Sequence, residues 1–163
     1  MNSTSVLYLI LLFFIIFGCF LILNEVFVNG PKRRKYNKII NLYNDSVDMS
    51  LVRVKKIQKT LENNPENQSF VDKHNFMGLY VIYNKTKKKY FVGADTYVFD
   101  AVVRHISGQG YSNLYRDVLD GNELCVRTIP YSDLERIGLN DLELAWNMAK
   151  LGFKSSNPKY GYN

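Results

Sequence analysis

Four side chains in the C-terminal half of the sequence have chemical types that hydrolytic sites use. They are Tyr80, the adjacent pair Arg104 and His105, and Glu143. A tyrosine or a histidine can orient a water molecule or accept its proton, an arginine can stabilise growing negative charge, and a glutamate can bind a hard cation. Whether they act together depends on the elements that carry them.

Each of these residues also has a structural interpretation. Tyr80 suits a half-buried strand position, because its ring is apolar and its hydroxyl can reach water. His105 suits a solvated helix end. Glu143 follows Asn140 by three residues, which is the spacing of a capping box. The residue types alone leave both interpretations open.

The clearest local pattern is a β-hairpin with the candidate tyrosine in its first strand. Residues 78–84 alternate with period two and are rich in β-branched and aromatic types, as a half-buried strand requires. The polar, lysine-rich run 84–88 favours a turn, and 89–92 resumes the apolar character. Gly78 and Gly93 bound the strands, either as simple boundaries or where another chain segment approaches closely.

Three further elements complete the expected domain, 76–163. Apolar spacing predicts a helix over 97–107, which carries Arg104 and His105. Alternation predicts a strand over 123–129, and a last helix over 140–151 ends at Gly152. Antiparallel strands flanked by helices give an α+β fold with a small three-stranded sheet.

The segment 1–30 is expected to be a transmembrane anchor. No residue in 2–24 is charged, and the apolar run 6–23 is long enough to cross the hydrocarbon layer as a helix. A cleavable signal peptide is the alternative, but no basic residue precedes the run and no small-residue cleavage site follows it. Basic residues next to a span favour the cytoplasmic side, so a single-pass protein with a cytoplasmic C-terminal domain is expected. These basic residues are Lys32, Arg33, Arg34, Lys35 and Lys38.

A helical stalk is expected within the basic juxtamembrane and linker segment 31–75. Apolar residues in 36–61 fit the a and d positions of a heptad pattern, except that the polar Ser50 occupies one of these positions. The stripe suits a homodimer through 36–61, packing on the domain, or contact with the membrane surface. The asparagine-rich run 63–67 then breaks the helix. The heptad residues are Ile40, Tyr43, Val47, Val54, Ile57 and Leu61.

The cysteine content and spacing argue against a disulfide-rich protein or a zinc protein, and the net charge does not decide between lipid and nucleic acid as the partner. Cys19 and Cys125 do not indicate a disulfide framework, and no paired Cys/His spacing indicates a zinc site. The net charge of the 163 residues is +6, and the juxtamembrane cluster supplies part of it. Such a cluster suits anionic lipid headgroups as well as nucleic acid.

The order of motifs along the C-terminal half points to a protein family more specifically than any single motif does. Gly78-Leu79-Tyr80 and Phe91-Val92-Gly93 are followed by a helix with His105, a strand, a helix with Glu143, and a closing Gly161-Tyr162-Asn163. From Met77 to Asn163 this order resembles the GIY-YIG nuclease domain. The resemblance implies metal-dependent hydrolysis of DNA phosphodiester bonds.

The resemblance also implies roles for four residues. Tyr80 matches the first motif tyrosine, which orients or deprotonates the attacking water, and His105 matches a helix histidine that assists the proton transfer. Glu143 matches the metal ligand, which implies Mg²⁺ or a similar divalent cation. Asn163 matches a late asparagine that hydrogen-bonds near the site.

Two positions depart from the family pattern. Phe91 stands where the second motif has a tyrosine, so the ring is kept and the hydroxyl is lost. Ala101 stands where the family has an arginine, and alanine cannot stabilise charge on the attacked phosphate. Arg104, three residues further on, is the expected substitute.

The resemblance makes DNA the expected partner and leaves three functions to compare. Phosphate contacts are expected from Lys87, Lys88, Lys89 and Arg127. The chain is either a membrane-anchored nuclease, a catalytically lapsed domain that binds nucleic acid, or a tethered protein-interaction module.

Overall fold

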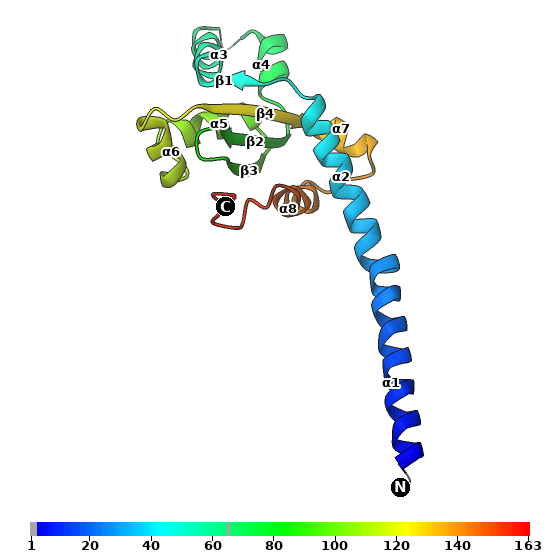
Figure 1. The fold of residues 1–163 in the computed structure, drawn as a ribbon. Coiled ribbons are helices and arrows are strands. Elements are labelled where there is room, and N and C mark those ends of the chain that lie inside the picture. Colours follow the sequence, from blue (N-terminus) through cyan, green and yellow to red (C-terminus); the bar gives the residue numbers. More distant parts are fainter. Residues whose placement is uncertain (1–2, 65) are drawn as a thin grey trace. The chain divides into compact units, whose positions relative to one another are not determined.

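The computed structural model describes residues 3–64 and 66–163 (Figure 1). The chain divides into an N-terminal unit that ends at Lys35 and a compact unit from Tyr36 to Asn163. The compact unit therefore includes most of the segment 31–75, which the sequence suggested was a stalk and a linker.

The N-terminal part is helical, as the sequence predicts. Helix α1 (Ser3–Asn24) is followed by one π-helical turn, η1 (Glu25–Asn29), and by α2 (Gly30–Asp45). This continuous helix is long and apolar enough to cross a membrane. The expected apolar N-terminal helix is therefore present.

The compact unit is built on an antiparallel sheet in the order β1-β4-β2-β3. The predicted strands form β2 (Gly78–Asn84), β3 (Lys89–Asp95) and β4 (Leu124–Pro130). The expected count of three strands is wrong, because β1 (Met49–Ser50) pairs with β4. A two-residue strand inside a helical pattern has no periodicity of its own, which explains why the sequence does not reveal it.

Helices cover both faces of the sheet, so the fold is α+β with three layers (Figure 1). Alternate β2 side chains enter two separate apolar clusters: Tyr80 and Ile82 on one face, Leu79 and Val81 on the other. The first face is covered by α3 (Leu51–Asn63), α4 (Gln68–His74), α5 (Val98–Ile106) and α6 (Ser112–Leu119). The second is covered by α2, α7 (Tyr131–Arg136) and α8 (Leu142–Phe153).

The prediction of one helical stalk over 36–61 is wrong. Helix α2 ends at Asp45, and Ser50 begins α3 as its N-cap, with its hydroxyl oxygen accepting the Arg53 N–H at 3.3 Å. Tyr43 then packs on one face of the sheet and Val54 on the other. Much of the apolar stripe is therefore packed on the domain, one of the alternatives that the sequence left open, although Val47 is exposed. A homodimer through 36–61 stays a prediction.

Helix α8 begins and ends later than predicted. Its N-cap is Asp141, whose carboxylate accepts the Leu144 N–H at 3.0 Å, so the capping box from Asn140 to Glu143 is not formed. The helix continues through Gly152, and the left-handed residue that closes it is Lys154. Glu143 therefore does not form the capping box that the sequence allowed.

The outer edge of β3 is paired with the last residues of the chain. Tyr90 donates its N–H to the Tyr160 carbonyl at 2.9 Å and accepts the Tyr162 N–H at 3.0 Å. The Asn163 side chain pairs with both backbone groups of Val92, at 2.8 and 2.9 Å. The edge strand is thereby protected from pairing with other chains.

A buried carboxylate joins this C-terminal segment to the hairpin. Asp117 on α6 accepts hydrogen bonds from the Asn84 amide at 3.0 Å and from the Tyr162 hydroxyl, and it pairs with Lys87. The Asn84 amide also donates to the Tyr162 hydroxyl at 2.7 Å. Burial opposes ionisation, but the hydrogen bonds from Lys87 and Tyr162 outweigh it and lower the pKa of Asp117.

Replacing this carboxylate should destabilise the domain. Asp117→Ala is expected to lower the free energy of unfolding of the 36–163 fragment by about 3 kcal/mol, because buried polar groups lose their acceptor. Urea denaturation measures the change, with the exposed Asp120→Ala as the control.

The same variant should change the acid dependence of stability. Because the folded-state pKa of Asp117 is lowered, its contribution is present at neutral pH and is lost as the pH falls through that value. The Asp117→Ala domain should therefore lose less stability on acidification. An unchanged dependence would contradict the role given to this carboxylate.

Candidate functional site

Tyr80 and His105 come together between β2 and α5. The Tyr80 hydroxyl oxygen lies 3.0 Å from His105 Nε2, and the Tyr111 backbone N–H donates to His105 Nδ1 at 3.0 Å. A backbone N–H can only donate, so Nδ1 carries no proton and Nε2 carries one. His105 therefore donates to the Tyr80 oxygen, which leaves the Tyr80 hydroxyl hydrogen free for another acceptor.

Two glycines make room for the rings of this pair. A Cβ atom at Gly93 would lie 2.1 Å from Tyr80 Cζ and 2.3 Å from its hydroxyl oxygen. A Cβ atom at Gly110 would lie 2.3 Å from His105 Nδ1. Of the two interpretations of Gly93, the structure supports close approach.

The surroundings keep both members of the pair neutral. Burial and the neighbouring charge of Arg104 hold the pKa of His105 below its ordinary 6.5. Burial and the charge of Asp95 raise the pKa of Tyr80. At neutral pH the pair is a neutral imidazole and a protonated phenol, which suits hydrogen-bond donation by Tyr80 better than deprotonation of water by it.

The two residues that depart from the GIY-YIG pattern, Phe91 and Ala101, belong to the same apolar cluster as Tyr80. The Phe91 ring is 4.5 Å from the His105 ring and 6.1 Å from the Tyr80 ring, so it keeps the packing of an aromatic residue without a hydroxyl. Ala101 is 1% exposed in the same apolar cluster. An arginine at 101 would place an uncompensated charge in this core.

Arg104 supplies a positive charge near the pair from the outer side of α5. Its guanidinium donates to Asp95 Oδ2 at 2.8 Å, and the Arg104 side chain is 51% exposed. The Arg104 charge acts to lower the pKa values of both Tyr80 and His105, so it is close enough to interact with the pair electrostatically. Exposed ion pairs are weak, so an anionic ligand can take the place of Asp95.

Glu143 is exposed at the start of α8, the helix that packs on the Leu79 and Val81 face of the sheet, whereas Tyr80 lies on the other face. Trp146, one turn later, donates its indole N–H to the Val92 carbonyl at 2.8 Å, next to Gly93. Within the described residues no group of three His, Cys, Asp or Glu could hold a metal ion. A single carboxylate fits only a cation that keeps most of its waters or takes oxygens from a substrate, as Mg²⁺ does.

Asn163 and Arg127 have structural partners. The Asn163 amide is occupied by the Val92 backbone, so it fixes the β3 edge beside the site. Arg127 donates to the Tyr43 carbonyl at 2.9 Å and pairs with Asp48, which ties the end of α2 to β4. The phosphate contact predicted for Arg127 therefore competes with internal bonds.

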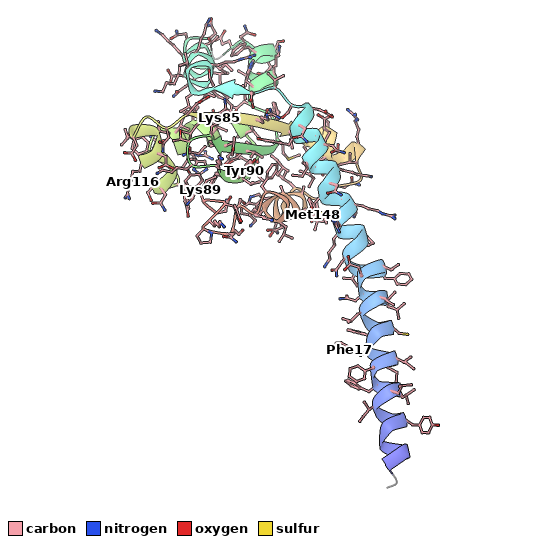
Figure 2. The ribbon with its side chains drawn as sticks, in the orientation of Figure 1. Phe17, Lys85, Lys89, Tyr90, Arg116 and Met148 are labelled. Atoms are coloured by element: carbon pink, nitrogen blue, oxygen red, sulfur yellow. The ribbon has the colours of Figure 1, made fainter. Side chains whose placement is uncertain are left out.

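Of the hairpin lysines predicted to contact phosphate, one forms an internal ion pair and the others are available at the surface. Lys87 pairs with Asp117, and Lys88 is exposed in the turn with a positive φ of 54°. Lys89 and Arg116 lie on the same side of the compact unit (Figure 2). Both line a cavity of about 410 Å³.

Sequence reasoning missed three residues that shape the site. Tyr111 fixes the His105 tautomer through its backbone, and Gly110 makes room for the His105 ring. Asp117 lies on α6, an eight-residue helix whose pattern is too short to stand out. The sequence signals for them were the Gly108-Gln109-Gly110 run and the single acidic residue within the helix.

Comparison of the chain with family models, curated proteins and solved structures found no match in any of the three. The functional assignment therefore depends on the residues of the site.

A methyl group at Gly93 tests the geometry of the pair. Gly93→Ala should lower the free energy of unfolding of the 36–163 fragment by about 1–3 kcal/mol, because it overpacks the Tyr80 ring. In a Tyr80→Ala background the cost should largely disappear, since the clashing ring is gone. A double-mutant cycle in urea measures the coupling, and equal costs in the two backgrounds would contradict the contact.

Proposed function

We propose that this chain is a membrane-anchored, GIY-YIG-like nuclease that hydrolyses DNA phosphodiester bonds with a divalent cation. The observation that carries the proposal is the hydrogen-bonded Tyr80–His105 pair, 3.0 Å apart, with Gly93 making room for the tyrosine. The pair joins two residues that the resemblance had matched separately, and 25 positions separate them in the chain.

In the proposed hydrolysis each residue of the site has a separate role. Tyr80 donates its free hydroxyl hydrogen to an oxygen of the attacked phosphate, and the His105 N–H, which donates to the tyrosine oxygen, orients the hydroxyl and strengthens that hydrogen bond. Arg104 exchanges Asp95 for a phosphate oxygen. Phe91 and Ala101 exclude water behind the pair.

Glu143 is the residue proposed to hold the cation. The exposed carboxylate suits Mg²⁺ that keeps most of its waters. When bound, such a cation polarises a phosphate oxygen and stabilises charge on it.

A second candidate function is a lapsed domain that binds DNA without cutting it. It is favoured by the buried Ala101, which cannot supply the missing charge, and by the missing hydroxyl at Phe91. This candidate predicts salt-sensitive DNA binding without metal-dependent products.

Cleavage by the full chain in lipid nanodiscs separates the two candidates. With Mg²⁺ and plasmid or branched DNA, the wild type should give products, and Tyr80→Phe or His105→Ala should reduce the rate by about 100-fold or more. Glu143→Gln should abolish the metal-dependent cleavage. Glu135 is an exposed glutamate on α7, and Glu135→Gln should leave the cleavage rate unchanged. Binding without products would support the lapsed domain.

The pH profile of cleavage should report His105. Because the pKa of His105 is lowered, the neutral form should persist below 6.5, and the rate should fall only at more acid pH, where Nδ1 gains a proton. An acid limb above 6.5 would contradict a neutral histidine in the site.

The proposed setting is a single-pass membrane protein with the compact unit in the cytoplasm. The apolar helix and the basic residues that follow it support this orientation. Protease added to the cytoplasmic face of sealed vesicles should digest the compact unit, and protection would contradict the orientation.

A further inference from the structure

A positively charged cavity of about 410 Å³ lies between the hairpin turn, α6 and the C-terminal segment. Three cationic side chains line it, Lys87, Lys89 and Arg116, against one carboxylate, Asp117. Asp117 is already paired with Lys87. Within the described residues neither Lys89 nor Arg116 has an acidic partner, so the cavity keeps a net positive charge of about two.

This cavity adjoins the Tyr80–His105 pair through Tyr111. Tyr111 lines the cavity, its backbone N–H holds His105 Nδ1 at 3.0 Å, and its ring lies 5.7 Å from the Phe91 ring. Asn163 also lines the cavity, and its amide holds Val92, the neighbour of Gly93. A ligand in the cavity is therefore next to the residues proposed to act on a phosphodiester.

The lining suits a single nucleotide. A phosphate can lie between Lys89 and Arg116, which lie on the same side of the compact unit (Figure 2). The Tyr111 side chain is 37% exposed, so a base can stack on its ring. A cavity of this volume matches a small-molecule site, whereas duplex DNA needs an extended groove.

We propose that this cavity binds one unpaired nucleotide adjacent to the bond that is cut. The inference rests on the proposed function and specifies its substrate: a single strand, a flap or a frayed end in preference to continuous duplex. Arg116 and Lys89 bind the phosphate, and Tyr111 binds the base.

Strand binding by the full chain in nanodiscs tests the proposal. The probes are a fluorescein-labelled oligothymidine and a labelled hairpin duplex of equal charge, followed by anisotropy over a series of salt concentrations. Arg116→Gln and Lys89→Gln should each weaken strand binding about tenfold and reduce the salt slope by about one. Tyr111→Ala should weaken it about tenfold through lost stacking.

The matched control is Arg136→Gln, which removes an exposed charge on α7. It should leave strand affinity unchanged, and thermal unfolding of each variant checks that the fold is kept. Tighter binding of the duplex than of the strand, or equal losses in the control, would overturn the proposal.

Cleavage kinetics distinguish failure of this inference from failure of the proposed function. If metal-dependent cleavage occurs and Arg116→Gln leaves KM for the strand unchanged, the cavity is not the nucleotide site and the nuclease assignment stands. If the strand binds through Arg116 and Lys89 but no product forms, the cavity assignment stands and the nuclease assignment fails.

Discussion

The ionised carboxylate of Asp117 is the interaction on which the arrangement of the candidate site depends. It joins the end of β2 through Asn84, the hairpin turn through Lys87, and the C-terminal segment through Tyr162. These segments are far apart in the sequence, and each is polar where it meets the others. An apolar side chain at 117 would leave the buried Tyr162 hydroxyl and the Asn84 amide without this acceptor.

The position of the C-terminal segment has consequences for the Tyr80–His105 pair. Once Tyr162 is held by Asp117, Asn163 can pair with both backbone groups of Val92. Val92 precedes Gly93, the residue against which the Tyr80 ring packs. The carboxylate on α6 thus stabilises, through the edge of β3, the backbone that determines where the tyrosine hydroxyl lies.

The sequence predicts the parts of the fold with strong local patterns. The hairpin, α5 and β4 were expected nearly where they lie, because their alternation or helical spacing is continuous. The apolar stripe in 36–61 was misinterpreted, because two helices that pack on opposite faces of a sheet can together imitate one heptad pattern. A capping serine at 50 was the only local sign of the break.

The candidate site was predictable to a smaller extent, because much of it is made by backbone. Tyr80 and His105 could be named from their types and order, but the tautomer of His105 depends on the backbone N–H of Tyr111. A backbone donor is present whatever residue stands there, so residue type carries no signal for it. Gly93 is intermediate: its residue type allowed a close approach, but which ring approaches it, that of Tyr80 thirteen positions earlier, depends on the fold.

The two departures from the family pattern have unequal physical consequences. Phe91 still packs against His105 at 4.5 Å, so the aromatic packing around the pair is complete without its hydroxyl. Ala101 is 1% exposed, and an arginine there would need a partner that this apolar cluster lacks among its described members. The positive charges near the pair therefore lie at its rim: Arg104, which pairs with Asp95, and Lys89 and Arg116, which line the cavity. In the proposed nuclease these are the side chains that would neutralise the attacked phosphate.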